Sequence, residues 1–245
     1  MSNIVADIIA ECGRKSHSVK NAIRNKKDAM NTTTIPGTDI LLLANDQVIT
    51  PHCLRTGRLD WDRSFLQIPE IANLKSGDVV LDIGAFIGDT TKIFLDKGCV
   101  VHAFEAYPDA AHCLKHNCPT AIIYDQPVGD GVSYIAPLGE GGNMGARFCI
   151  PNWDGPKTLR IDDLKLPRID FVKIDVEGFE PFVLDGAKET FQRLHPPIMI
   201  EVNWYGYMRY GFKESDILNR LSAMRYRWRE VKRADAKLWD AMATA

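Results

Sequence analysis

Long hydrophobic runs are missing from this 245-residue sequence, and neither sign of charge is in large excess. No apolar stretch approaches the roughly 18 residues that suggest a membrane-spanning helix. The 30 basic and 32 acidic residues give a formal charge of −2, which argues against a protein held to nucleic acid or membrane by bulk electrostatics. The apolar stretch at the N-terminus contains Asp7 and Glu11, so we do not expect a secretory signal there.

The six cysteines include no C-x-x-C pair, the spacing typical of many zinc and redox sites. A chain of this length buries enough apolar surface to fold without disulfides, so we expect reduced thiols and a cytoplasmic protein. His112 and His116 stand four residues apart, as zinc ligands on a helix can, but no third ligand follows at a recognisable spacing. We therefore interpret them as ordinary helix residues.

Residues 1–75 are expected to form a small N-terminal cap of helices and strands. The predicted elements are, in order, a polar helix over 2–28, a strand pair within 40–50 that turns near Asn45-Asp46, and a helix around 60–74. At the other end, residues 234–245 are expected to be a C-terminal tail.

Short apolar strands alternate with helical segments across residues 76–233, which we expect to form the main domain. Strands are predicted at 79–84, 99–105, 121–125, 169–175, 197–202 and 226–231, and helices at 88–97, 108–117, 180–194 and 213–224. Strands that are apolar throughout and separated by helices indicate a parallel sheet covered on both faces. The prediction is an α/β fold with a doubly wound, mostly parallel, Rossmann-like sheet.

The first of these strands leads into a glycine-containing turn, where ligands of doubly wound sheets bind. Gly84 allows a tight turn after the strand, and Gly88 lets the following helix pack closely on the sheet. Glu105 ends the second strand, 21 residues beyond Gly84. This spacing is typical of a carboxylate that accepts hydrogen bonds from two ribose hydroxyls.

A nicotinamide dinucleotide fits this turn poorly. Phe86 stands where the dinucleotide fingerprint has a second glycine, and Asp89 places a negative charge where phosphate would bind. S-adenosylmethionine is adenosine-like, cationic and free of phosphate. Asp82 would attract its ammonium group and Asp125 its adenine amino group, although Asp125 can equally well cap a turn. The predicted cofactor-binding residues are Asp82, Gly84, Ala85, Phe86, Gly88, Asp89, Thr90, Glu105, Ala106 and Asp125.

Several segments together resemble the ordered motifs of the FkbM-type S-adenosylmethionine-dependent methyltransferases. They are VVLDIGAFIGDT, AFEAYP, LRIDDL, FVKIDVEGFEPFVLDGA and PIMIEV, and the similarity covers roughly residues 40–230. The resemblance implies a class I methyltransferase fold and methyl transfer to hydroxyl oxygens of sugars, glycans or secondary metabolites. Nothing is implied for residues 1–38 and 233–245.

Carboxylates follow the fourth and fifth strands of the predicted domain. A hydroxyl is a poor nucleophile, so a base is expected to assist methyl transfer. In one interpretation Asp175 or Glu177 is that base and Glu201 orients the acceptor. In the other, Asp175, Glu201 and Asn203 hold Mg²⁺ or Ca²⁺, which lowers the pKa of the hydroxyl. A third, structural interpretation is that Glu177 and Glu180 cap the next helix.

Two further segments have open roles. The glycine-rich stretch 139–148 is either a lid over the acceptor or the turn of a hairpin between 132–136 and 146–150. The aromatic-rich stretch 204–212 either holds a sugar or base, or packs on the next helix.

Ribose 2′-O methylation of RNA is the alternative function, motivated by basic clusters at 14–27 and 220–233. The chain lacks the D/N-P-P-aromatic motif of base-amino methyltransferases, since Asp175-Val176-Glu177-Gly178 stands in its place, and it lacks a Pro-Cys nucleophile. A module that binds the cofactor without turnover is a third class, against which the carboxylates at 175, 177 and 201 argue.

Overall fold

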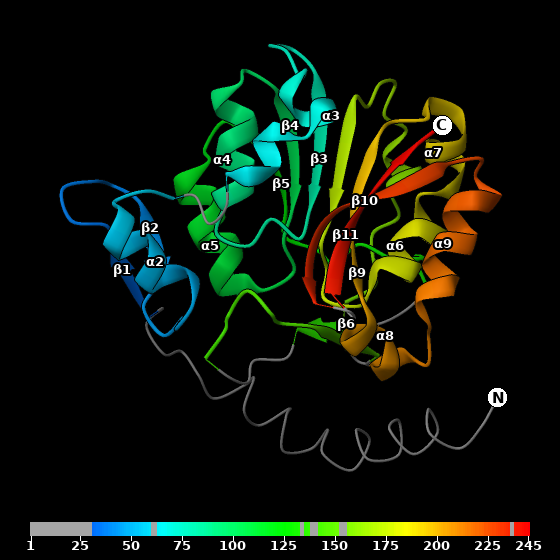
Figure 1. Ribbon diagram of the computed structural model, residues 1–245. Coiled ribbons are helices and arrows are strands. Elements are labelled where there is room, and N and C mark those ends of the chain that lie inside the picture. The colour runs from blue at the N-terminus through cyan, green and yellow to red at the C-terminus, as the bar shows by residue number, and fades with distance from the viewer. Residues whose placement is uncertain (1–30, 60–62, 133–134, 138–141, 152–155, 236–237) are drawn as a thin grey trace. The chain divides into compact units, whose positions relative to one another are not determined.

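The computed structural model describes residues 31–59, 63–132, 135–137, 142–151, 156–235 and 238–245 (Figure 1). The chain divides into two compact units, Met1–Asn31 and Thr32–Ala245. All described elements belong to the second unit, so residues 32–75 are part of the same unit as the sheet. The helix predicted over 2–28 and the basic cluster at 14–27 lie outside the described residues.

A seven-stranded sheet forms the centre of the second unit, in the order β10-β11-β9-β8-β3-β4-β5 (Figure 1). Strands β9, β8, β3, β4 and β5 are mutually parallel, and β11 and β10 complete the sheet in antiparallel fashion. The strands are β3 (Val79–Ile83), β4 (Val100–Phe104), β5 (Ile122–Tyr124), β8 (Phe171–Ile174), β9 (Ile198–Asn203), β10 (Arg227–Asp235) and β11 (Leu238–Thr244). The order reverses between β3 and β8, the point at which such sheets bind ligands.

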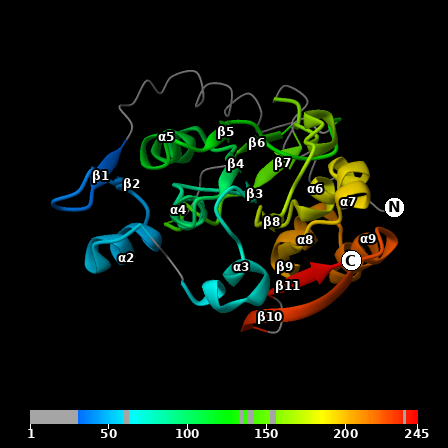
Figure 2. The ribbon, with the colours of Figure 1, turned by 90° about the horizontal axis from the view of Figure 1, so that it is seen from above.

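Helices cover both faces of this sheet (Figure 2). Successive side chains of a strand point to opposite faces, so Val80 packs in one apolar cluster and Leu81 in the other. One face carries η1 (Ser64–Gln67), α3 (Pro69–Ala72), α4 (Asp89–Asp96) and α5 (Pro108–Asn117), and the other carries η2 (Ile161–Leu164), α6 (Glu180–Gly186), α7 (Lys188–Leu194) and α9 (Glu214–Ala223). The predicted doubly wound α/β fold is confirmed.

The helix predicted over 180–194 is two helices, α6 and α7, which meet at Ala187. The buried carboxylate of Asp162 accepts hydrogen bonds from the backbone amides of Glu189 and Thr190, at 3.3 and 2.8 Å. These amides belong to the first turn of α7, whose N–H groups have no partner within the helix. The cap therefore stabilises a new helix start inside the predicted one.

The predicted C-terminal tail is wrong, because residues 238–244 form β11 inside the sheet. Strand β11 lies between β10 and β9 and pairs antiparallel with both. Its side chains alternate between the two clusters, with Ala241 and Ala243 on one face and Met242 on the other. Alanine is depleted in strands, so residues 238–244 carry only a weak strand signal.

The strand pair predicted within 40–50 is also wrong. The hairpin consists of β1 (Thr32–Thr34) and β2 (Leu41–Leu43), and 49–56 is the helix α2 (Ile49–Thr56). The carboxylate of Asp46 accepts a hydrogen bond from the amide of Thr50 at 2.6 Å, which favours a helix start over a strand. The helix predicted around 60–74 is limited to η1 and α3, and Pro69 stands at the first position of α3.

A two-stranded sheet of β6 (Ile135–Pro137) and β7 (Cys149–Pro151) lies outside the central sheet. It confirms the hairpin interpretation of the glycine-rich stretch, whose residues 139–141 lie outside the described part. The aromatic-rich stretch forms the helix α8 (Trp204–Tyr210). Within the described residues, no helix is both long and apolar enough to cross a membrane.

Candidate active site

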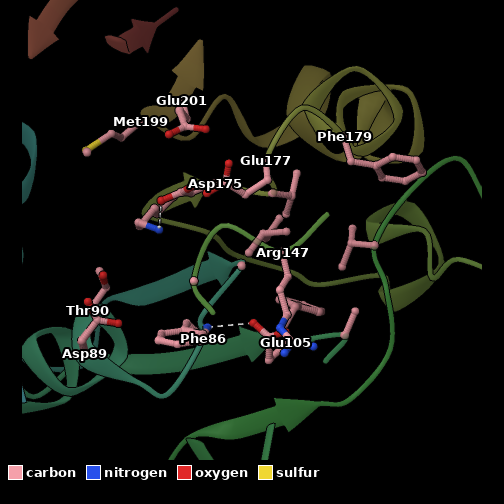
Figure 3. A pocket seen from close by; sticks show the side chains of 18 of the residues that line it. Phe86, Asp89, Thr90, Glu105, Arg147, Asp175, Glu177, Phe179, Met199 and Glu201 are labelled. Atoms are coloured by element: carbon pink, nitrogen blue, oxygen red, sulfur yellow. Dashed lines mark hydrogen bonds and ion pairs between the residues drawn. The ribbon is translucent and has the colours of Figure 1, made fainter. Parts of the chain in front are cut away.

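A cavity of about 510 Å³ opens at the carboxyl ends of β3, β4, β8 and β9 (Figure 3). It therefore lies at the reversal of strand order, where the fold predicts a ligand. The residues predicted from sequence that line it are Gly84, Phe86, Asp89, Thr90, Glu105, Ala106, Asp175, Glu177 and Glu201.

The turn after β3 passes directly against the end of β8. Gly84 has a φ of +86°, and a Cβ atom at this position would lie 1.8 Å from the backbone oxygen of Asp175. The amide of Asp175 donates in turn to the carbonyl of Ile83 at 3.0 Å. Only glycine satisfies both the positive φ and the close approach. Gly84 therefore allows the turn after β3 to lie directly against the residues that follow β8.

Glu105 follows β4 and is held by two backbone amides. Its Oε2 accepts from Phe86 N at 2.8 Å and its Oε1 from Tyr107 N at 2.7 Å (Figure 3). Burial raises the pKa of Glu105 to about 7, and the two amides counteract part of that shift. Because each oxygen has a further lone pair, the carboxylate can accept two more hydrogen bonds from a ligand.

Asp82, which was predicted to attract an ammonium group directly or through water, does not line the cavity, so a direct contact is not formed. It is fully buried beneath the cavity, where Thr91 Oγ1 donates to its Oδ2 at 2.7 Å. Its other oxygen lies 3.9 Å from Lys173 Nζ, which also bonds to Asp175 Oδ2 at 3.0 Å. Asp82 thus influences the site through Lys173 and not by direct contact.

Lys173 is a cavity residue that the predicted site did not include. Burial alone would lower the pKa of its ammonium group, but the charges of Asp175, Asp82 and Asp89 raise it overall. Burial also raises the pKa of Asp89 to about 6. The alternation of side chains along β8 had placed Lys173 on the same face as Asp175, and this was the signal that could have identified it.

Three more predicted cofactor residues lie away from the cavity lining. Ala85 is buried in the apolar cluster under α4. A Cβ atom at Gly88 would lie 2.7 Å from Cys118 Sγ. This glycine therefore allows α4 to begin close to α5, whereas the sequence predicted that it allows the helix to pack closely on the sheet. Asp125 is exposed and pairs with Lys115 at 2.6 Å, and its neighbour Gln126 lines the cavity instead.

Asp175, Glu177 and Glu201 meet on one side of the cavity (Figure 3). One carboxylate oxygen of each lies within 4.8 Å of the others. Burial followed by the charge of Asp175 raises the pKa of Glu177 to about 8 and raises that of Glu201 well above its usual value. Carboxylates this close do not all ionise near neutral pH, so the cluster can hold a proton and accept another.

The turn that presents Glu177 is fixed from both sides. Glu180 is fully buried, and its Oε1 accepts from the amides of Val176 and Gly178 at 2.9 and 3.2 Å. Glu180 therefore braces the turn before α6, whose N-terminus has no side-chain cap, and Glu177 faces the cavity, so the capping interpretation fits neither residue. A Cβ atom at Gly178 would lie 2.5 Å from Gly206 Cα, so α8 packs directly on this turn.

Asn203 presents a nitrogen to the carboxylates. Its Oδ1 accepts a hydrogen bond from Gly206 N at 2.9 Å, and its Nδ2 donates to Oε2 of Glu201 at 3.0 Å and of Glu177 at 3.1 Å. A backbone amide only donates, so this contact fixes which end of the side chain is the oxygen. The N–H groups of Asn203 face the carboxylates, so Asn203 offers no oxygen to the predicted Mg²⁺ or Ca²⁺ ligand set of Asp175, Glu201 and Asn203. Asp175 and Glu201 lie instead with Glu177 in an acidic group that could hold a metal ion.

The segment 142–149 borders the cavity opposite the carboxylates. Most of it belongs to the glycine-rich stretch that the sequence predicted as either a lid over the acceptor or a hairpin turn. Asp46 holds it by accepting from Met144 N at 2.9 Å. The guanidinium of Arg147 lies 3.7 Å from the ring centre of Tyr107, and both side chains line the cavity. Tyr107 could have been predicted as a cavity residue, because it stands two residues after Glu105. Arg147 could not, because only the hairpin of β6 and β7 brings it to the cavity.

The aromatic residues of α8 serve mainly to pack the site. Tyr207 is fully buried and its hydroxyl donates to the carbonyl of Glu201 at 2.9 Å. The hydroxyl of Tyr210 donates to the carbonyl of Cys149. These contacts support the packing interpretation of the aromatic-rich stretch.

The basic cluster at 220–233 is partly neutralised within the described residues. Arg220 bonds to Asp185 and Arg229 to Glu70, each at 2.9 Å or less in its shortest contact. Lys232 lines the cavity. The cluster therefore does not form a uniformly positive groove.

The sheet is doubly wound, with the glycine turn at Gly84 after its first parallel strand and the acidic residue Glu105 after its second. These features define a Rossmann-like fold of the class I methyltransferase type. The sequence model of a protein family, described as the methyltransferase FkbM domain, matches residues 82–228. The chain belongs to the FkbM methyltransferase family, as its motifs suggested. No curated relative matches it.

Solved structures share the fold at low sequence identity. A methyltransferase FkbM from Methylobacillus flagellatus KT is 14% identical with a TM-score of 0.51, over 96% of this chain and 60% of that one. The chain therefore spans about 60% of the length of that relative. Two further structures match. A TehB-like SAM-dependent methyltransferase from Corynebacterium glutamicum is 14% identical with a TM-score of 0.49, over 80% of this chain and 93% of that one. A fibrillarin pre-rRNA processing protein from Methanococcus jannaschii is 14% identical with a TM-score of 0.44, over 69% of this chain and 67% of that one.

Proposed function

We propose that this chain transfers the methyl group of S-adenosylmethionine to a hydroxyl oxygen of a sugar, glycan or secondary metabolite. One observation carries the proposal: a single cavity is lined both by Glu105, the proposed ribose ligand, and by a cluster of carboxylates, among them the proposed proton acceptor. Membership of the FkbM family supports methyl transfer as the reaction.

The residues around the glycine turn fit this cofactor better than a dinucleotide. Gly84 is packed so closely against Asp175 that no other residue fits, while Phe86 and Asp89 line the cavity where a pyrophosphate would need space and positive potential. Glu105 would bind the ribose hydroxyls, and Asp175 adds negative charge for a cationic ligand. Bound S-adenosylmethionine supplies a methyl group on a positively charged sulfur.

Glu177 is the proposed general base, and Glu201 orients the acceptor hydroxyl. An efficient base has a pKa near the working pH, and that of Glu177 is raised to about 8. Asp175 Oδ2 is already occupied by an ion pair with Lys173 Nζ at 3.0 Å, so Glu177 is the preferred candidate for the base. With the methyl donor bound, Glu177 would accept the hydroxyl proton as the C–O bond forms and the methyl–sulfur bond breaks, with the sulfur leaving as a neutral thioether that keeps the bonding electron pair. The cavity walls would hold the acceptor in line and exclude water.

Replacing Glu105 by alanine is expected to weaken S-adenosylmethionine binding about 100-fold. Each hydrogen bond to a charged group contributes about 1.5–3 kcal/mol, and a tenfold change in affinity corresponds to about 1.4 kcal/mol. Isothermal titration calorimetry measures the loss, with far-ultraviolet circular dichroism as the control for an intact fold. Unchanged affinity would remove Glu105 from the cofactor site.

Removal of divalent metal is expected to leave methyl transfer within twofold of its starting rate. Asn203 directs N–H groups at two of the three carboxylates, an arrangement that stabilises them without a cation. The measurement compares the rate before and after treatment with EDTA and desalting. A loss that Mg²⁺ or Ca²⁺ restores would contradict this mechanism.

Turnover with methyl-labelled S-adenosylmethionine tests the proposal directly, against panels of sugars, polyketides and RNA. Label in a sugar or polyketide hydroxyl would support it. Ribose 2′-O methylation of RNA would replace it, and binding of RNA would then fall steeply with salt. Cofactor binding with no labelled product from any acceptor class would favour a non-catalytic module.

A further inference from the structure

Asn203 is the last residue of β9 and makes three hydrogen bonds that join separate parts of the site. Its oxygen caps α8, and its nitrogen reaches Glu177 from the turn after β8 and Glu201 from its own strand. The side chain is buried, with 6% of its surface exposed. It uses one oxygen, Oε2, of each glutamate and leaves Oε1 of each for other partners.

Glu177 and Glu201 each have a carboxylate oxygen within 4.8 Å of the other's, so the two side chains repel one another when both are ionised. N–H donors favour the ionised form of a carboxylate, and the bond from Asn203 lowers the otherwise raised pKa of Glu201. The other charged groups around the pair are Lys173 of β8, Asp175 directly after β8, Glu180 of α6, Arg209 of α8, Asp240 of β11, which pairs with Glu201, and Lys232 of β10, which pairs with Asp240. These groups are three acids and three bases, so together with Glu177 and Glu201 the site holds five acids and three bases. The N–H groups of Asn203 offset part of the remaining repulsion without adding charge.

We propose that Asn203 is a positioning residue, which holds Glu177 and Glu201 in one orientation with their free oxygens available to the acceptor and controls how many protons the pair carries. This inference rests on the proposed function, because it assigns the pair its role in methyl transfer. Asn203 itself contacts neither the reacting oxygen nor the methyl group in this role.

Two variants separate positioning from helix capping. Serine and aspartate cap helices about as well as asparagine, so Asn203→Ser and Asn203→Asp both retain an acceptor for Gly206 N. Serine is too short to reach the glutamates while it caps, and aspartate lacks the N–H groups and adds a fourth acid. Thermal unfolding of both variants is the control for folding.

The expected result is a shift of the pH–rate profile of kcat towards higher pH. The wild-type rate is expected to rise with pH and to level off above about 8, the value to which the pKa of Glu177 is raised. Asn203→Ser raises that midpoint by at least half a pH unit, which is about threefold in rate below the midpoint, and Asn203→Asp raises it further. The KM for S-adenosylmethionine stays within twofold, because the cofactor contacts are elsewhere in the cavity.

A measurement on the free protein separates this inference from the proposed function. Carbon-13 NMR of glutamate side chains follows the ionisation of Glu177 and Glu201 without cofactor or acceptor, and both variants are expected to titrate at higher pH than the wild type. If neither the NMR midpoints nor the pH–rate profile moves, Asn203 only caps α8 and the inference is overturned. If the midpoints move but no acceptor is methylated, the proposed function fails and the control of proton occupancy stands.

Discussion

Replacing Glu177 by glutamine is expected to lower kcat about 1,000-fold and to leave the affinity for S-adenosylmethionine within threefold. Glutamine keeps the size and the contact with Asn203 but cannot take the proton of the acceptor hydroxyl, and a general base typically contributes about 100–10,000-fold. The measurement pairs steady-state kinetics, with the acceptor found in the panel, with calorimetric titration of the cofactor.

Two further variants sharpen this result. Asp175→Asn is expected to cost less than Glu177→Gln, because the Asp175 carboxylate is already paired with Lys173. Asp96→Asn, at an exposed ion pair with Lys92 on α4, is the control and should retain the wild-type rate. If Asp175→Asn abolishes turnover while Glu177→Gln does not, the assignment of the base is wrong.

Replacing Gly84 by alanine is expected to destabilise the protein by about 3 kcal/mol or more. The φ of +86° costs a non-glycine residue about 1–2 kcal/mol. The added Cβ would also overlap the backbone oxygen of Asp175, and relief of such overlap requires a backbone shift of similar cost. The expected fall in Tm is roughly 6–12 °C for a protein of this size, together with loss of cofactor binding.

Gly77→Ala provides a matched control for this variant. Gly77 has a φ of +87°, but nothing lies within 4 Å of the position of its Cβ. It therefore has the same backbone strain without the overlap. The difference between the two variants in free energy of unfolding, from urea titration, isolates the contact between β3 and β8. Equal losses would show that this contact contributes nothing.

The part of the site that follows from local sequence was predictable. Gly84 and Glu105 belong to one strand-turn-helix-strand unit, so their spacing alone placed them in a common cavity. The carboxyl ends of parallel strands meet at one edge of the sheet, which brought Asp175 and Glu201 together. These predictions needed only strand boundaries and strand order.

The parts that failed depend on contacts between distant segments. The burial of Asp82 depends on Thr91 of α4 covering it. The orientation of Asn203 depends on the amide of Gly206, and hence on a helix where the sequence indicated an aromatic loop. Strand β11 has small side chains whose strand character comes from pairing with β9 and β10 and not from their own preference.

The position of β11 also imposes an order on assembly. Strand β10 is made first but has no hydrogen-bonded neighbour in the sheet except β11, which is made after it and joins β10 to β9. During synthesis, the edge of β9 therefore stays open until residues 238–244 have been made. Pairings between distant segments form slowly, and an unpaired edge strand invites association with other chains. The interval before β11 docks is thus the stage at which the nascent protein depends most on protection from aggregation.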